Sequence, residues 1–209
     1  MPFSRADAEM EVKFIRRRIF AFTLIELLVV IVIIAILMGL AFPVFQGVQN
    51  QAKKTQAKND LTQIVTAVNA FYTEYGRYPT GATTDPAAVY ESGSSNNNNQ
   101  LLIELLGKTG TINTRQIVFI SPPSVKDEAK PRAGLTTAGR YYDPWGSPYA
   151  IALDADYDNE VTNPYGAGKG AGPDKIRQGV ISWSFGKDTQ VGNKGDGKFT
   201  SSDDVISWQ

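Results

Sequence analysis

The arrangement of apolar and polar positions divides the chain into an apolar segment, an amphipathic segment and a mixed remainder. Residues 19–45 carry one charged side chain, Glu26. A helix of about 20 apolar residues spans the roughly 30 Å hydrocarbon core of a bilayer, so residues 22–45 are predicted to cross a membrane. A basic triplet, Arg16 to Arg18, comes just before the segment. Because such charges stay on the cytoplasmic side, the rest of the chain is expected across the membrane.

Beyond this segment the pattern is that of an amphipathic helix. Residues 46–60 are polar, and apolar residues then recur at the spacing of one helix face. That face consists of Leu61, Ile64, Val65, Val68, Phe71, Tyr72 and Tyr75. Gly76 and Pro79 are signals that end a helix. We therefore predict one helix over residues 22–75, about 80 Å long at 1.5 Å per residue, whose amphipathic half, 46–76, packs on a globular head.

Two features of the apolar half require an explanation. A glutamate within a membrane costs roughly 2.5 kcal/mol or more, so Glu26 is expected to have a partner. Pro43 lies inside the predicted helix, shortly after Gly39. Because proline removes a backbone hydrogen bond, a bend or local melting is predicted between these two residues.

Residues 77–209 are predicted to form one α+β head. The expected elements are a short buried helix at 101–106, a strand or extended segment at 117–120, and strands of an antiparallel sheet at 149–153 and 180–185. A terminal strand or edge segment is expected at 205–208. Residues 80–100 are polar and of low complexity, which predicts a loop, and no function is assigned to them.

Composition narrows the function classes. Residues 22–209 hold 16 basic and 18 acidic side chains, a net charge of −2, which offers no electrostatic footprint for nucleic acid. The chain has no cysteine, so no disulfide can restrain an exported domain. It has no histidine either, which removes the commonest general base and the usual zinc ligand. The chain is therefore predicted not to be an enzyme.

The run Phe22-Thr-Leu-Ile-Glu-Leu after the basic triplet resembles the N-terminal signature of the type IV pilin superfamily. The resemblance implies that residues 1–21 are a leader, that a prepilin peptidase cleaves between Ala21 and Phe22, and that the new Phe22 amine is N-methylated. It also implies that Glu26 acts in subunit assembly, and that Pro43 accompanies helix melting when subunits pack into a filament. Ala21 departs from the glycine usual in the family. An ordinary signal anchor or secretory signal is the alternative.

Two further segments resemble the major pseudopilins of type II secretion systems. Tyr141 to Tyr149 contains Asp-Pro-Trp-Gly-Ser-Pro-Tyr and reads, from its prolines and glycine, as a rigid turn that leads into a strand. The C-terminal segment resembles the loop that binds Ca²⁺ in that family. The implied ligands are the side chains of Asp188, Asp203 and Asp204 and the backbone carbonyl of Phe185. The connection between them is longer than usual in the family, so Asp196 is an alternative ligand, and solvated turn aspartates are the other interpretation.

A third acidic segment, Asp154 to Glu160, has the alternating aspartates of an EF-hand loop. That loop needs Gly at its sixth position and Glu at its twelfth, where this chain has Asn159 and Tyr165. A solvated acidic turn is the favoured interpretation, and a second weak cation site remains the alternative.

The resemblance implies an α+β pilin fold, in which the long N-terminal helix packs on a small antiparallel sheet with a C-terminal loop. It implies a structural subunit of a periplasmic pseudopilus that drives type II secretion, anchored in the inner membrane by a single span with its head in the periplasm. The implied partners are identical and minor pseudopilin subunits, the prepilin peptidase and the inner-membrane assembly platform. The alternatives are a type IV pilus subunit, acting in adhesion or motility, and a membrane-anchored calcium-binding module that does not polymerise.

Overall fold

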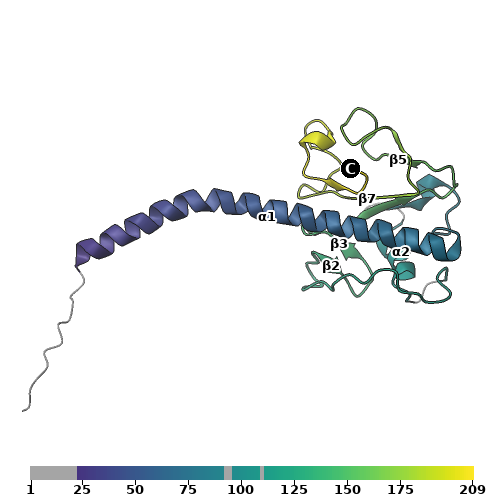
Figure 1. The fold of residues 1–209 in the computed structure, drawn as a ribbon, viewed down its shortest axis with the longest axis horizontal. Helices are drawn as coiled ribbons and strands as arrows, with labels where there is room; N and C mark the ends of the chain where they lie inside the picture. Colours follow the sequence, from purple (N-terminus) through teal and green to yellow (C-terminus); the bar gives the residue numbers. More distant parts are fainter. Residues whose placement is uncertain (1–22, 92–95, 109–110) are drawn as a thin grey trace, which may run out of the picture. The chain divides into compact units, whose positions relative to one another are not determined.

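The computed structural model describes residues 23–91, 96–108 and 111–209, and nothing is described for the side chains of residues 40–44 (Figure 1). The chain divides into two compact units, Met1–Gln46 and Gly47–Gln209. Helix α1 (Leu24–Tyr75) contributes residues to both of them. The predicted long helix is therefore confirmed over the described residues.

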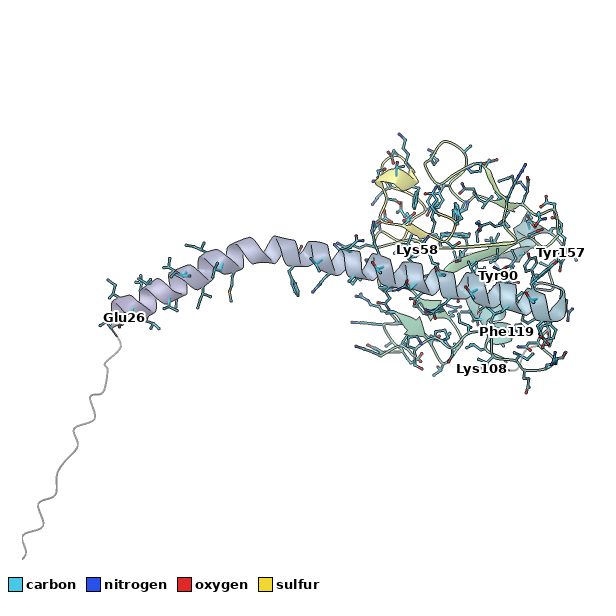
Figure 2. All side chains as sticks on the ribbon, in the orientation of Figure 1. Glu26, Lys58, Tyr90, Lys108, Phe119 and Tyr157 are labelled. Atoms are coloured by element: carbon cyan, nitrogen blue, oxygen red, sulfur yellow. The ribbon has the colours of Figure 1, made fainter. Side chains whose placement is uncertain are left out.

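In the first unit, α1 is hydrophobic on all sides. Large apolar side chains from Leu24 to Met38 are 44 to 87% exposed. They project around the helix near Glu26 in Figure 2. The helix continues through Gly39 and Pro43, so of the predicted bend or local melting the melting is absent from this single chain, and melting on filament packing stays a prediction. No helix within residues 23–91, 96–108 and 111–209 is both long enough and apolar enough to cross a membrane.

The second unit contains a four-stranded antiparallel sheet in the order β1-β4-β7-β8. Its strands are β1 (Val89–Tyr90), β4 (Ala150–Leu153), β7 (Val180–Ser184) and β8 (Val205–Ile206). Two small antiparallel ribbons, β2 (Gly134–Leu135) with β3 (Tyr141–Tyr142) and β5 (Val161–Thr162) with β6 (Lys175–Ile176), lie outside that sheet. The remaining elements are α2 (Asn98–Leu105) and the 3₁₀ helices η1 (Asp85–Ala88) and η2 (Phe199–Ser201).

The amphipathic half of α1 packs on one face of this sheet. Leu61, Ile64 and Phe71 are fully buried, and they share a core with Ile151 and Leu153 of β4. Burial of each such side chain contributes about 1.5–3 kcal/mol. The helix ends as predicted, because the Gly76 N–H donates to the carbonyl of Tyr72 at 2.8 Å and Gly76 has φ +67°, a conformation that glycine adopts without strain.

Polar contacts also join α1 to the sheet. Asp60 is buried on the inner face of the helix, where its Oδ2 accepts a hydrogen bond from the Tyr149 hydroxyl at 2.7 Å. The Ser182 hydroxyl of β7 donates to the carbonyl of Leu61 at 3.4 Å. The Lys58 ammonium, labelled in Figure 2, donates to the carbonyl of Ile206 in β8 at 2.7 Å. These bonds connect the helix to the residue just before β4, to the central strand β7 and to the edge strand β8.

A second core covers the opposite face of the sheet. It contains Ala150 and Ala152 of β4 with Ile181 and Trp183 of β7, packed under the segments that carry β5 and β6. Every residue of β4 and β7 is consequently buried. The polar positions of β7, Ser182 and Ser184, are therefore not solvent-facing, since both hydroxyls bond inside the protein.

The prediction for residues 80–100 was wrong over part of its length. This segment supplies η1, strand β1 and the start of α2, although residues 92–95 lie outside the described ranges. Asn98 is buried, and its side-chain amide donates to the carbonyls of Tyr141 and Tyr149, both at 2.9 Å. The segment 117–120 is extended rather than a strand, and Phe119 N–H donates to the carbonyl of Leu105.

Candidate functional site

The N-terminal motif begins α1 with a reciprocal pair of hydrogen bonds. The Thr23 hydroxyl accepts from the Glu26 N–H at 3.3 Å, while Oε2 of Glu26 accepts from the Thr23 N–H at 2.9 Å. The Thr23 hydroxyl also donates to the same Oε2 at 2.8 Å. This is a capping box, which satisfies backbone donors that a helix leaves free at its start. The spacing Thr-x-x-Glu before an apolar run carries this signal, and the sequence interpretation missed it.

The other predicted residues of this motif are described only in part. Ala21 and Phe22, the cleavage and methylation positions, lie outside the described residues. Pro43 lies within α1, and its side chain is not described. Their roles in processing and assembly therefore stay predictions, as does the role of Glu26.

The C-terminal segment brings the three predicted metal-binding side chains together. Each of Asp188, Asp203 and Asp204 has a carboxylate oxygen within 4.8 Å of those of the other two. Asp188 follows β7, whereas Asp203 and Asp204 lie between η2 and β8. The group therefore joins the two ends of the connection between these strands.

The backbone around Gly186 allows this approach. A side-chain carbon at Gly186 would lie 2.7 Å from Cγ of Asp203, so only glycine leaves room for that carboxylate. Gly186 also has φ +63°, which favours glycine. The adjacent Lys187 N–H donates to Oδ2 of Asp203 at 2.6 Å. The local chain thus holds one carboxylate of the group in place.

Asp204 is the buried member of the group. Its side chain is 5% exposed, and its Oδ2 accepts from the Tyr165 hydroxyl and the Gly192 N–H, both at 2.7 Å. Its Oδ1 is buried and has no hydrogen-bond partner. Burial, with smaller contributions from the charges of Asp188 and Asp203, raises the pKa of the Asp204 carboxyl. A buried carboxylate oxygen without a partner is costly, and a cation would satisfy it.

These donors suit calcium. Ca²⁺ takes six to eight oxygen ligands at 2.3–2.6 Å, so two ligands of one ion can lie up to about 5 Å apart. The chain supplies no histidine or cysteine for a softer metal. The donor set is made only of oxygens, and the unpartnered Oδ1 of Asp204 would gain a partner if a cation were bound.

Two other predicted candidates lie beside this group in the sequence. Asp196 is exposed and accepts hydrogen bonds from the Lys198 N–H and the Ser201 hydroxyl, and it is not part of the group. The side chain of Phe185 packs in the second core, and the part of its carbonyl in binding an ion stays a prediction. Tyr165, which the sequence interpretation missed, lies 39 residues before Asp204 and carries no local sequence signal.

The Asp-Pro-Trp-Gly turn supports the start of the same loop. Oδ1 of buried Asp143 accepts from the N–H groups of Trp145, Gly146 and Ser147 at 2.7–2.9 Å. Its Oδ2 accepts from the Ser184 hydroxyl at 2.6 Å. The turn therefore leads into β4, as predicted, and also holds the end of β7 from which the acidic loop departs.

Comparisons with known proteins each cover less than a third of the chain. Residues 16–42 match the prokaryotic N-terminal methylation motif. The chain is 44% identical over 57 residues to the type IV major pilin protein PilA of Myxococcus xanthus, which covers 27% of this chain and 26% of that protein. It is 41% identical over 64 residues to the type II secretion system core protein G of Pseudomonas aeruginosa, and 37% identical over 65 residues to that of Aeromonas hydrophila. Those two alignments each cover 31% of this chain, and 45% and 46% of the relatives.

The chain thus spans less than half the length of each of these relatives. No solved structure matches the chain. The matching motif and relatives are those of pilin-like structural proteins and not of enzymes. They include a pilus protein and secretion proteins at similar identity, so they do not favour one kind of filament over the other.

Proposed function

We propose that this chain, which carries the N-terminal methylation motif of the type IV pilin superfamily, is a structural subunit of a type II secretion pseudopilus. Residues 22–45 anchor the precursor in the inner membrane, and the unit Gly47–Gln209 is the periplasmic head. A prepilin peptidase removes residues 1–21 and methylates Phe22. Subunits then leave the membrane through an assembly platform and stack, with minor subunits, into a filament whose growth moves folded proteins outward.

The observation that carries the proposal is the exposed apolar surface of α1. The large apolar side chains between residues 24 and 38 are all exposed in the single chain. A helix that is hydrophobic on all sides is stable only when it is surrounded by other apolar groups. Lipid supplies such groups before assembly, and copies of the same helix supply them inside a filament.

Glu26 gives this surface a register. The Glu26 carboxylate accepts two hydrogen bonds from Thr23, both on Oε2, and among the described residues no bond is made to Oε1. The remaining oxygen can accept from the Phe22 amine of a neighbouring subunit. Because Coulomb attraction is stronger at low dielectric and an unpaired charge there costs several kcal/mol, this pair would fix the axial position of each subunit.

The C-terminal region favours a pseudopilus over a pilus. The chain has no cysteine to close this region by a disulfide, and instead it brings three aspartates together at the junction of β7 and β8. We propose that Asp188, Asp203 and Asp204, with the carbonyl of Phe185, hold one Ca²⁺ there. The 44% identity to a major pilin favours the second candidate, a type IV pilus subunit. A calcium-binding module that does not polymerise is the third.

Deletion of the gene tests these candidates in one strain. If the chain is a pseudopilus subunit, secreted proteins should accumulate in the periplasm of the deletion strain while surface pili remain. If it is a pilus subunit, surface pili should be lost while secretion continues. Complementation with wild type should restore the lost activity, and Glu26→Leu should not. The matched control is Glu128→Leu in the head, an exposed position where the change removes one surface hydrogen bond, from the Thr137 N–H, and it should complement as wild type does. Full secretion and normal pili in the deletion strain would contradict both filament functions.

A further inference from the structure

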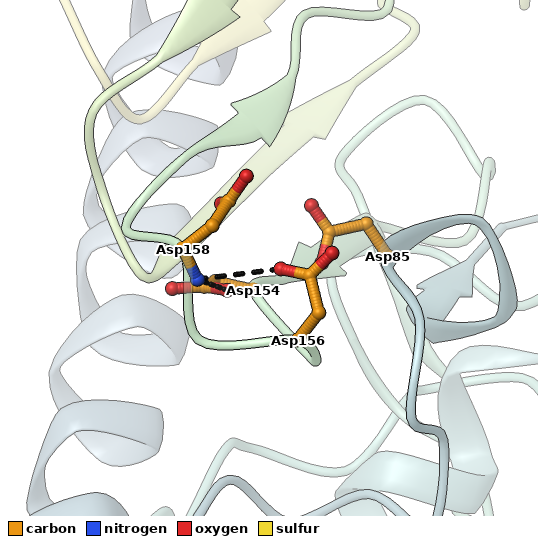
Figure 3. A group of neighbouring side chains, drawn as sticks. All are labelled: Asp85, Asp154, Asp156 and Asp158. Atoms are coloured by element: carbon orange, nitrogen blue, oxygen red, sulfur yellow. Dashed lines mark hydrogen bonds between the residues drawn. The ribbon is translucent and has the colours of Figure 1, made fainter.

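A second group of carboxylates lies at one end of the central strands β4 and β7, and the C-terminal loop lies at their other end. The loop after β4 carries Asp154, Asp156 and Asp158, and Asp85 of η1 points toward it (Figure 3). One carboxylate oxygen of each of the four lies within 4.8 Å of the others. Asp85 and Asp154 are buried, while Asp156 and Asp158 are exposed. The group therefore has two buried ligands and an open side toward solvent.

The loop is folded so that its carboxylates converge. Oδ1 of Asp154 accepts from the Asp158 N–H at 3.1 Å, and Oδ2 accepts from the Asn159 N–H at 2.9 Å. Asp156 also accepts from the Asp158 N–H, at 3.3 Å. Asn159, at the sixth loop position where an EF-hand has glycine, takes φ +66°. Asparagine tolerates this left-handed conformation better than most residues, so the absence of glycine does not prevent the turn.

Asp85 supplies the carboxylate that the loop lacks at its twelfth position. Its Oδ1 accepts from the Ala155 N–H at 2.8 Å, which holds the side chain against the loop. Its Oδ2 is buried and has no hydrogen-bond partner, and the residue is 7% exposed. Figure 3 shows this carboxylate directed at the group formed by the three loop aspartates. The residue at the twelfth position, Tyr165, contacts the C-terminal group instead, where its hydroxyl donates a hydrogen bond to Asp204.

No positive side chain neutralises the group within the described residues. The ion pairs there are Arg115 with Glu74 and Arg177 with Glu160, and neither includes the four aspartates. Several carboxylates beside an unpartnered buried oxygen are costly in free energy, and a bound cation would lower that cost.

We propose that Asp85, Asp154, Asp156 and Asp158 bind a calcium ion, at a site separate from the C-terminal group. The ligands are all oxygens, and Ca²⁺ accepts the irregular arrangement of a loop plus one distant carboxylate, completed by water on the open side. Mg²⁺ demands near-octahedral geometry and gives up its water reluctantly, so this set selects against it.

The ion would connect three parts of the head. Asp85 precedes edge strand β1, and Asp154 follows β4, to which β1 is paired. Tyr157, in the same loop, stacks on Tyr78 with ring centroids 5.6 Å apart, just beyond the end of α1. Calcium at this site would therefore hold the two-residue edge strand and the end of the helix to the central sheet.

Calcium stoichiometry of the full chain in detergent tests this inference. Equilibrium dialysis with radioactive Ca²⁺ should give two equivalents for wild type and one for Asp85→Asn, which keeps an oxygen for the Ala155 N–H. Asp156→Asn alters an exposed side chain and keeps an oxygen for the Asp158 N–H, and it should raise the dissociation constant of one equivalent at least tenfold. Asp127→Asn, which removes an exposed charge remote from both groups in sequence, should leave both equivalents intact.

The C-terminal proposal fails separately. If only the C-terminal proposal is wrong, wild type binds one equivalent, Asp85→Asn binds none, and Asp188→Ala has no effect. If Asp85→Asn and Asp156→Asn both bind as much calcium as wild type with unchanged affinity, the four aspartates form an ordinary acidic turn and the inference is overturned.

Discussion

Calcium should stabilise the head through the C-terminal aspartates, and Asp188→Ala should remove that effect. An ion that binds only the folded state adds about 2.7 kcal/mol when its free concentration is one hundred times the dissociation constant. For a unit the size of Gly47–Gln209, each kcal/mol moves the melting temperature by about 2–4 °C. The expected shift is therefore about 5–11 °C. Its structural origin is the orphaned Oδ1 of Asp204, together with the mutual repulsion of the three carboxylates.

The assay is thermal unfolding of the full chain in detergent, followed by near-ultraviolet circular dichroism with millimolar Ca²⁺ or with chelator. Measurement in the Asp85→Asn background isolates the C-terminal group from the second proposed site. In that background Asp188→Ala should erase the shift, and Asp127→Asn should preserve it. Coincident melting curves with and without calcium in the Asp85→Asn protein would refute the reasoning and leave these residues as turn aspartates.

Three further predictions concern the helix. Burial raises the pKa of the Asp60 carboxyl above 3.8, so stability from its protonated form is lost as pH rises through the raised value. Asp60→Asn, which still accepts from Tyr149, should thus gain stability relative to wild type as the pH rises from below the ordinary pKa of an aspartate, measured by urea unfolding; a difference that does not change with pH would contradict this. Leu61→Ala should cost about 2.7–5 kcal/mol by the same measurement, because Leu61 is fully buried, and a loss below about 1 kcal/mol would disprove tight packing. Glu26→Leu should enter the membrane as well as wild type but give few crosslinked oligomers, and a normal crosslinking ladder would exclude its assembly role.

Periodicity and local signals predicted much of the fold. The apolar face from Leu61 onward predicted how α1 packs, because burial of a helix depends on spacing along one element. Gly76 predicted the end of the helix for an equally local reason. The runs at 149–153 and 180–185 became β4 and β7, with boundaries shifted by one residue. In each case the sequence signal lies within a few neighbouring residues of a single helix or strand.

Contacts between distant residues were not predictable in this way. Asp85 lies in a segment that composition alone presented as a polar loop, yet it meets the aspartates after β4 because β1 pairs with β4. Tyr165 reaches Asp204 for a similar reason, since the second core brings the two segments together. The EF-hand pattern was set aside because the loop has Asn159 in place of the sixth-position glycine and Tyr165 in place of the twelfth-position glutamate; a carboxylate contributed by another segment, such as that of Asp85, has no sequence signature.

The N-terminus of the mature protein tests the central claim most directly. The match of residues 16–42 to the N-terminal methylation motif motivates the test. Mass spectrometry of the protein extracted from membranes of its own host should find a chain that begins at Phe22 and carries one methyl group on its amine. An intact leader, or cleavage at another bond, would contradict the assignment of this chain as a pilin-type filament subunit.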